Sequence, residues 1–543
     1  MKAYSKQKAD DTDSMESNTK YKTSWGSEIK SVYNEGDINK HDRSELGNPG
    51  EYPFCRGVYP RMYRQRLWTK RFLIGHQSVE EFNKRQKAMI ASGSTGINFI
   101  PCSNSYMRGF DSDMVEKELV GVTGTPVDSL LDAEIAFNDI RLDKVSSAFN
   151  SPNPHVLIAM YFVLAQKQGV DLAQLQGTSN QSDFISHWIS CQQMNRFPLS
   201  GHLRCMIDHA KFCSRYVPNW HPLSIVGQHM SEAGASAAQE IAFAFSTGKF
   251  YIRELIKAGL DIDEFAPRLS FFFNVRSQFF EEIAKFRAAR RVWFRMMKEH
   301  FKAKNPRSLT FRFHVQTAGV ALTAQQPLNN ISRAAYHALS AVLGGAQSVH
   351  IDAYDEALCN PTELSSLTAL RNNQILQLET KVTHTVDPLG GSYYVESLTN
   401  QLEVRIVALL EEIDQMGGIV KAVESGWIHK EISNSAYEFQ QAIESGNLPI
   451  VGVNCHQTED EKLPMDLFEV PETLHIQEKK LKRIKEERSD SQVRKALDNI
   501  ARCCDKDENL MDVMVDSVKA YITEGEVSNT IKKSYGTWNP PLF

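Results

Sequence analysis

Short runs of β-forming residues alternate with longer helical patterns between about residue 90 and residue 390. Such alternation is typical of parallel strands joined by crossover helices. Helices are expected between most of the runs, for example over 232–259 and 329–345. The pattern favours an α/β fold, a (β/α)8 TIM barrel, over an open doubly wound sheet, and leaves open whether the sheet closes. The eight candidate strands are 96–100, 145–150, 172–178, 223–228, 269–275, 309–317, 348–354 and 382–388.

The chain on either side of this alternation has a different character. Residues 1–50 are rich in Ser, Asp, Lys, Asn and Gly with little apolar periodicity, which predicts a polar N-terminal arm. Residues 51–400 then hold the barrel. From 401 to 543 a C-terminal helical appendage is expected, with helices over 401–424, 430–446 and 472–500. The charged run "EKKLKRIKEERSDSQVRKAL" in it is either a solvated face or a surface for another subunit.

Composition narrows the class of protein. A net charge of -5 over 543 residues gives no clustered basic face for nucleic acid. No apolar run approaches the roughly 20 residues that span a bilayer, and the first 50 residues lack a signal-peptide core. Nine cysteines, an odd number without a C-x-x-C pair, suit a reducing compartment. We therefore expect a cytoplasmic protein that binds neither nucleic acid nor membrane.

One group of metal-ligand residue types needs a check. His202, Cys205, His209 and Cys213 recur at helical spacing, and His and Cys are the usual zinc ligands. The first and last lie roughly 16 Å apart along one helix, too far to share an ion. A buried helix face is the better interpretation, and no metal site is predicted.

Polar residues fall at the carboxyl ends of the candidate strands, where barrel enzymes build their active sites. Amides and imidazoles dominate, and each of them could also only satisfy loop backbone groups. We find no paired carboxylates, activated nucleophile or Gly-rich phosphate loop among them. Such a site suits a reaction whose difficult step is supplied by a cofactor. The residues are Asn98, Thr178, Gln181, Gln228, His229, His314, Gln316, Asp352, Glu356 and Asp387.

Long motifs point to a family. They are "YPRMYRQRLWTKR", "GFDSD", "GVDLAQLQGT", "GQHMSEAGASAAQEIAFAF", "IKAGLDIDEFAPRLSFFFNV", "QFFEEIAKFRAARRVW", "FRFHVQTAGVALTAQQPLNN", "AQSVHIDAYDEAL" and "DPLGGSYYVESLTNQLE". In this order they resemble the large catalytic subunit of the methylmalonyl-CoA mutase family from about residue 50 onward. The resemblance implies a coenzyme A thioester threaded through the barrel, adenosylcobalamin on its rim, and radical 1,2-migration of the thioester carbonyl.

The resemblance also implies roles for single residues. His229 matches the histidine that hydrogen-bonds the thioester carbonyl, and Gln181 a glutamine on the substrate side. Gln228 replaces a tyrosine before that histidine, and Asp352 replaces an asparagine near the adenosyl ribose. The positions that match coenzyme A contacts are Tyr59, Arg66 and Arg268, and those near the cofactor are Gln316, Glu356 and Glu232.

The expected acyl group is inferred from positions at which this sequence differs from the family that it resembles. The arginine that clamps the substrate's free carboxylate falls on Cys191 or Gln192, depending on a gap, and neither pairs with a carboxylate. Burying that carboxylate without a cation would cost several kcal/mol. Ile100 stands where 2-hydroxyisobutyryl-type relatives bind the hydroxyl with aspartate, and Leu73 where carboxylated-substrate members have tyrosine. We expect a branched, non-carboxylated acyl-CoA of the isobutyryl, 2-hydroxyisobutyryl or pivalyl kind.

Two alternatives remain open at this point. They are methylmalonyl-CoA mutase proper and a degenerate paralogue that binds acyl-CoA without catalysis. No D-x-H-x-x-G cobalamin signature occurs in the sequence. The resemblance therefore implies a separate small cobalamin-binding subunit that supplies the lower cobalt ligand in a heterodimer or heterotetramer. The arm and residues 401–543 are expected to help hold it.

Overall fold

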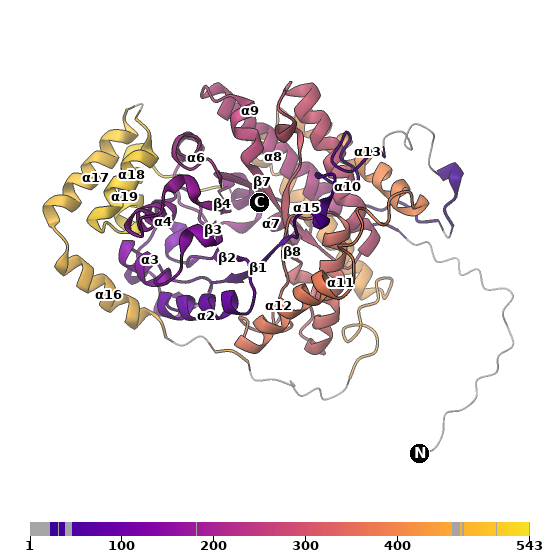
Figure 1. Cartoon of the computed structure of the whole chain (residues 1–543), viewed down its shortest axis with the longest axis horizontal. Coiled ribbons are helices and arrows are strands. Elements are labelled where there is room, and N and C mark those ends of the chain that lie inside the picture. The colour runs from indigo at the N-terminus through magenta and orange to yellow at the C-terminus, as the bar shows by residue number, and fades with distance from the viewer. Residues whose placement is uncertain are drawn as a thin grey trace, which may run out of the picture.

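The computed structural model describes residues 22–30, 32–37, 46–75, 77–180, 182–458, 467–469, 472–506 and 508–541. Parallel strands form one sheet in the order β5-β4-β3-β2-β1-β9-β8-β7-β6 at the centre of the molecule (Figure 1). They are β1 Thr69–Ile74, β2 Gly96–Phe99, β3 Ser146–Asn150, β4 Gln176–Asn180, β5 Trp220–His221, β6 Leu223–Val226, β7 Leu269–Val275, β8 Phe313–Thr317 and β9 Ser348–His350.

The two edges of the sheet meet in one short stretch of chain. β5 and β6 are separated only by Pro222, which has no N–H to donate to a ladder. β5 pairs with β4 and β6 pairs with β7. The stretch 220–226 therefore joins both edges, and the sheet is nearly closed into a barrel. The predicted α/β barrel is confirmed.

The strand predictions were right for most of the sheet. They missed its first strand and placed a strand over 382–388 where there is none. β7 has the predicted bounds, while β4, β8 and β9 are displaced or shorter than predicted. The stretch 382–388 forms turns instead of a strand, and Asp387 there has a φ of +47° that no strand residue adopts. The eighth position belongs to β1, which the pattern did not reveal.

The inner face of the barrel is polar. In β7, Phe271 and Phe273 pack outward in the apolar core, whereas Ser270 lines the interior. The same alternation puts Arg71 of β1 inside the barrel and Phe72 in the core. Most TIM barrels fill this space with bulky branched side chains. Here small polar residues leave it hollow, and they also hide β1 from a hydrophobicity pattern.

Helices cover the outside of the sheet. In α8 the side chain of Ser236 accepts from the N–H of Gln239, and the Gln239 side chain reaches back to the N–H of Ser236, a reciprocal cap that starts the helix. The predicted helices over 232–259 and 329–345 are confirmed as α8 and α11. The outer helices are α2 Val79–Ala91, α3 Leu130–Ala136, α4 Val156–Lys167, α6 Leu199–Tyr216, α8 Ala237–Lys257, α10 Phe279–Arg295, α11 Asn330–Leu343, α12 Glu363–Leu378 and α13 Tyr393–Gln415.

The C-terminal helices occupy two sides of the barrel. α13 spans the predicted boundary at residue 400 and packs on α8 and α10, so it is part of the barrel's outer layer. The helices between residues 419 and 444 stay on that side, whereas the helices after residue 472 lie beside α3, α4 and α6 at the other edge (Figure 1). They cover α4, whose apolar sequence is buried from Val156 to Ala165. The remaining helices are α14 Ile419–Glu424, α15 Trp427–Glu444, α16 Leu474–Glu487, α17 Asp490–Cys504, α18 Leu510–Ser517 and α19 Glu524–Tyr535.

The described part of the predicted arm packs on the barrel. The N–H of Ser24 donates to Glu281 of α10 at 3.0 Å, and Tyr33 packs on Tyr394 of α13 with ring centroids 4.9 Å apart. Residues 1–21 and 38–45 of the arm lie outside the described residues.

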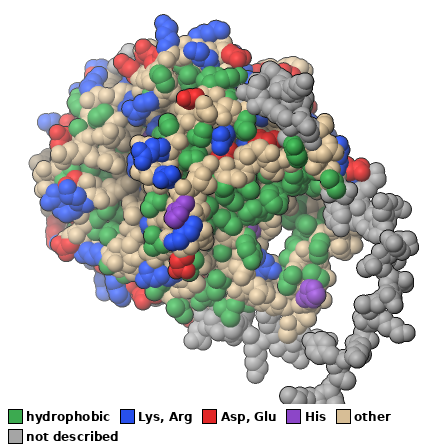
Figure 2. All heavy atoms as spheres, turned by 45° about the vertical axis from the view of Figure 1, so that its right-hand side comes forward, with side chains coloured by type: hydrophobic (Ala, Val, Ile, Leu, Met, Phe, Trp, Pro, Cys, Tyr) green, Lys and Arg blue, Asp and Glu red, His purple; other side chains and the backbone are tan. Residues whose placement is uncertain are grey.

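Charge and hydropathy of the outer surface agree with the composition. On the face in Figure 2, acidic and basic side chains are interspersed around a band of hydrophobic ones. Within the described ranges, every helix is too short or too polar to cross a membrane.

Candidate active site

A cavity of about 390 Å³ opens at the amino ends of the strands and extends into the barrel. Its mouth carries Tyr59 and four arginines, Arg66, Arg268, Arg307 and Arg312. Its inner wall is formed by residues of the strands themselves. The inner residues are Asn98, Ser146, Ala148, Thr178, Asn180, Ser224, Ser270 and His314.

The mouth is built to bind an anion. Arg268 is buried and donates to the hydroxyl of Ser214, while its Nη1 has no partner among the described residues. Burial lowers the pKa of Arg312, and Tyr59 acts against that shift through a hydrogen bond. No carboxylate in the described ranges lies within ion-pair distance of the mouth arginines. Guanidinium groups in this state suit phosphate groups, which they bind in bidentate fashion.

The inner wall holds polar atoms that the protein leaves without partners. Asn98 is 1% exposed, and neither atom of its side-chain amide is hydrogen-bonded within the described part of the chain. His314 contacts Ser348 Oγ through Nδ1 at 2.9 Å, while its Nε2 has no such partner. Buried polar groups normally find partners. Asn98, Thr178 and His314, which were predicted at the rim, thus lie deeper, along the path of a bound chain.

A five-residue π-helix, η8 His187–Cys191, follows β4 at its carboxyl end. The carboxylate of Asp183 accepts from the N–H groups of Ile185 and Ser186, which starts the preceding turn. Trp538 packs edge-on against Trp188 with ring centroids 5.0 Å apart. Single π-helical turns occur often at functional sites. This one is held in place by the C-terminal end of the described chain.

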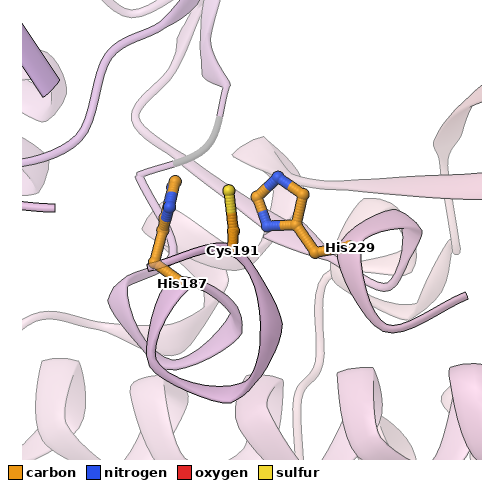
Figure 3. A group of neighbouring side chains, drawn as sticks. All are labelled: His187, Cys191 and His229. Carbon is orange, nitrogen blue, oxygen red and sulfur yellow. The ribbon is translucent and has the colours of Figure 1, made fainter. Parts of the chain in front are cut away.

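The π-helix faces α7 Gln228–Glu232, which follows β6. His187 and Cys191 project from one side of η8 toward His229 of α7 (Figure 3). One ligand atom from each of the three side chains lies within 4.8 Å of the other two. The His187 and His229 rings meet edge-on at 4.9 Å. The three side chains therefore share one small space at the carboxyl end of the barrel.

The His229 and Cys191 side chains are both uncharged. Burial lowers the pKa of His229 well below its usual value, and the nearby His187 adds to the shift. Burial raises the pKa of Cys191 to about 11 against the opposing charge of Arg108. A neutral imidazole and a neutral thiol thus face the site at pH 7. Such an imidazole hydrogen-bonds a carbonyl oxygen without adding charge.

The side chains of Cys191 and Gln192 lie in different surroundings. The Gln192 amide donates to the carbonyl of Trp188 at 2.9 Å and accepts from Arg196 at 3.4 Å. Its side chain is thus engaged by the helix that precedes it and by Arg196. Cys191 is the one that points toward His229. Gln228 opens α7, and its buried Oε1 has no partner among the described residues.

Carboxylates gather next to α7. Glu232 accepts from the N–H groups of Gly319 and Val320 at 3.1 and 3.0 Å. Asp352 accepts from Gln316 at 2.9 Å. The pKa of Glu232 is raised by burial and by repulsion from Asp352. Glu356 belongs to the same group, since desolvation and the charges of Asp352, Asp355 and Glu232 raise its pKa well above its usual value. These oxygens can accept hydrogen bonds from hydroxyl groups of a ligand.

The remaining predicted residues divide between site and scaffold. Leu73 is half-buried and stands outside the apolar core that takes Phe72 and Ile74. Ile100 packs against that core and over Gly75. Asp387 pairs with Arg56 and Arg287 away from the cavity. Gln181 lies outside the described residues.

The sequence interpretation missed His187, as it missed Arg307 and Arg312 of the mouth. His187 precedes Cys191 by four positions, a spacing that places both on one side of a helix. The His-x-x-x-Cys pattern was the available signal. It was overlooked because the partner His229 comes from another element.

Comparison with known proteins gives one consistent result. Residues 22–537 match the family described as Methylmalonyl-CoA mutase. The chain is 40% identical to the 2-hydroxyisobutanoyl-CoA mutase large subunit of Aquincola tertiaricarbonis over 95% of this chain and 92% of that protein. It is 38% identical to methylmalonyl-CoA mutase of Cereibacter sphaeroides, over 94% of this chain and 72% of that protein. Identity to the mitochondrial methylmalonyl-CoA mutase of Mus musculus is also 38%, over 94% of this chain and 68% of that protein.

Proposed function

The chain belongs to the methylmalonyl-CoA mutase family, and from that premise we propose that it is the large subunit of an adenosylcobalamin-dependent acyl-CoA mutase. Its relatives are acyl-CoA mutases, so the chain is an isomerase. The proposed reaction moves the thioester carbonyl to the neighbouring carbon of a branched, non-carboxylated acyl group.

One observation carries the proposal: the cavity has a cationic mouth, and the neutral side chains of His229 and Cys191 lie at the other end of the same barrel. Arg66, Arg268 and Arg312 at the mouth suit the phosphates of coenzyme A. The polar wall suits the amides of a pantetheine chain, and His229 and Cys191 lie at the carboxyl end of the barrel. A ligand with phosphates at one end and a neutral acyl group at the other matches this order of charges.

The acyl end lacks the means to hold a carboxylate. Cys191 occupies the position that we assign to the clamping arginine, and its thiol stays protonated. The aliphatic Leu73 follows Arg71 by two residues in β1, so it shares that inner face and would form part of the wall in place of an aromatic ring. Ile100 offers no hydrogen bond to a hydroxyl group. These features favour isobutyryl-CoA or pivalyl-CoA over methylmalonyl-CoA, even though a relative is named for the 2-hydroxyisobutanoyl ester.

The carboxylates near α7 fit the proposed cofactor. Glu232, Asp352 and Glu356 offer acceptor oxygens for the hydroxyls of an adenosyl ribose, and Gln316 is already oriented by its bond to Asp352. When bound, adenosylcobalamin would supply the hydrogen-abstraction chemistry that the side chains lack. The chain itself would orient the ester, hydrogen-bond its carbonyl through His229 and keep water away.

A small cobalamin-binding subunit is the proposed partner. A relative that matches nearly the whole chain is named a large subunit, which supports a two-subunit enzyme. We propose a heterodimer or heterotetramer in which residues 22–37 and the helices after α13 contact the partner. All nine cysteines are free, which agrees with a reducing compartment such as the cytoplasm.

The test uses the full chain with a small cobalamin-binding subunit and adenosylcobalamin. Isobutyryl-, 2-hydroxyisobutyryl-, pivalyl- and methylmalonyl-CoA are incubated separately, and isomerised esters are measured by mass spectrometry. We expect product from an uncharged branched ester and little from methylmalonyl-CoA. Product from methylmalonyl-CoA alone would contradict the proposed acyl group.

A second measurement separates catalysis from binding. The changes at Gln228 and Asp352 are what a binding-only paralogue would show. Electron paramagnetic resonance of the reconstituted complex with ester should reveal a radical coupled to cobalt(II). Ester binding by calorimetry without that signal would favour the paralogue.

A further inference from the structure

The trio His187, Cys191 and His229 contains two imidazoles and a thiol in one small space. We propose that these three side chains form a binding site for a divalent zinc-class metal ion, with Zn²⁺ as the fitting example. Nothing in the comparisons names such a site, and the spacing argument rejected only the separate group on α6. The proposal concerns this chain alone and does not depend on the cofactor.

The geometry needs little adjustment to hold an ion. Ligand atoms of the three residues already lie within 4.8 Å of one another. In a tetrahedral zinc site, with bonds of about 2.0–2.3 Å, ligand atoms are roughly 3.5 Å apart. A contraction of about 1 Å is within reach of side-chain rotations, because Cys191 and both imidazoles already point toward a common centre (Figure 3).

Two rigid elements supply the ligands. His187 and Cys191 come from one side of η8, and His229 comes from the first turn of α7. Trp538 packs on Trp188 between the two η8 ligands, and η8 contacts α7 directly. Ligands on packed helices are pre-positioned, which lowers the ordering cost of binding an ion.

The chemistry of the ligands selects the class of metal. Imidazole nitrogen and thiolate sulfur suit Zn²⁺ and Co²⁺, whereas Ca²⁺ and Mg²⁺ prefer oxygen ligands. A two-histidine, one-cysteine set fills three positions of a tetrahedron and leaves the fourth for water or a ligand atom, as in catalytic zinc sites. Binding would release the thiol proton of Cys191, since the thiolate is the ligand form.

A consequence concerns His229. A metal ion held by the trio would lie beside His229, in the space proposed for the thioester carbonyl. Metal and acyl-CoA should therefore compete, and this second statement rests on the proposed function. Metal occupancy would hold the enzyme in a state that binds ester weakly.

Direct titration tests the site. The cofactor-free full chain is titrated with Co²⁺ under reducing, chelator-free conditions. We expect the thiolate-to-cobalt charge-transfer band and the visible bands of tetrahedral cobalt, saturating at a single ion per chain. Zn²⁺ should then bleach both. Because loss of even an outer-shell partner lowers metal affinity roughly 10–100-fold, we expect Cys191→Ser and His187→Gln each to lower it at least about 100-fold.

Controls keep the outcome decisive. Cys455→Ser changes a half-buried cysteine that is not part of the trio and should leave the titration unchanged. Circular dichroism and thermal unfolding show whether each variant is folded. Absence of the charge-transfer band in the parent chain, or equal affinities of folded Cys191→Ser and parent, would overturn the proposed site.

Competition is measured by calorimetry with isobutyryl-CoA in the presence and absence of Zn²⁺. We expect at least a tenfold weaker ester affinity with Zn²⁺ in the parent and no difference in Cys191→Ser. Metal binding that leaves the ester affinity unchanged would overturn the proposed competition, but it would not overturn the proposed metal site. If no ester binds at all, the proposed function fails while the cobalt titration still judges the metal site.

Discussion

The two ends of the barrel differ in the charge of the side chains that they present. At the amino ends of the strands, arginines line an open mouth. At the carboxyl ends, η8 and α7 present neutral His229 and Cys191 next to a group of carboxylates. The mouth can supply attraction to an anion, while the far end supplies position. Under the proposed function, the contrast assigns affinity to one end of the barrel and reaction to the other, so that each can be altered separately.

Removal of the His229 imidazole should lower the rate of catalysis most, because it acts at the carboxyl end of the barrel. We expect His229→Gln to lower kcat about 10²–10³-fold, as loss of a hydrogen bond to a reacting oxygen does elsewhere. The ester affinity should change only a few-fold, because the mouth is intact. Steady-state kinetics measures both.

The pH profile checks the same residue. Since the pKa of His229 lies well below the usual histidine value of about 6.5, the imidazole stays neutral as pH falls from 8 to 6.5, and kcat should show no histidine limb there. His475→Gln, on the exposed side of α16, is the matched control. If His229→Gln had the same kcat as the parent, His229 would have no role in the reaction.

Removal of the Arg268 guanidinium should weaken ester binding at the mouth. This effect should be smaller than the effect of removing His229 on kcat. Hydrogen bonds to charged groups contribute about 1.5–3 kcal/mol, so Arg268→Ala should raise KM for the ester roughly 10–100-fold. We expect kcat to stay within a few-fold. Added salt should weaken ester binding more in the parent than in the variant, because it screens the mouth.

Arg215, an exposed arginine on α6, provides the control through Arg215→Ala. If Arg268→Ala lowered kcat and left KM unchanged, the division of labour between the two ends would be wrong.

A cation placed beside His229 should change the preference between charged and uncharged acyl groups. Cys191→Arg places a guanidinium beside His229, where a substrate carboxylate could pair with it. We expect the ratio of kcat/KM for methylmalonyl-CoA over isobutyryl-CoA to rise roughly tenfold, equivalent to about 1.4 kcal/mol. Cys191→Ser keeps the site neutral and should leave the ratio unchanged. An unaltered ratio in a folded Cys191→Arg chain would place Cys191 away from the acyl group.

A larger side chain at position 73 should have the smallest effect on the choice of ester. Leu73→Phe adds volume at the wall and should disfavour pivalyl-CoA relative to isobutyryl-CoA by about 1 kcal/mol, roughly fivefold. The ester panel measures the ratio. Leu364→Phe on the surface of α12 is the control. The same ester profile before and after Leu73→Phe would assign Leu73 to packing alone.

The sequence predicted the barrel where its strands are apolar and failed where they are polar. β7 was found with its bounds because phenylalanines dominate it. β1 was missed because Thr69 and Arg71 face the cavity, and burial of such residues depends on a hollow interior that no local pattern reveals. The stretch 382–388 misled for the opposite reason, since its β-branched residues belong to a loop fixed by Asp387 and two arginines.

The candidate site was predicted in part for similar reasons. His229, Gln316 and Asp352 lie at the expected carboxyl ends, since strand direction fixes that placement. The depth of Asn98 and His314 depends on where each strand begins, which patterns locate poorly. The contact between η8 and α7 joins separate elements, so the nearness of His187 to His229 could not be read from spacing.

The contact of Trp538 with Trp188 sets an order of events during synthesis. η8 is translated early, and the indole that packs on it emerges from the ribosome only after the whole barrel and the helices α16–α19. A nascent chain can pair its strands before that moment, but the turn that carries His187 and Cys191 lacks one of its supports until Trp538 has been added. The packing around this turn is therefore completed later than the pairing of the strands beside it.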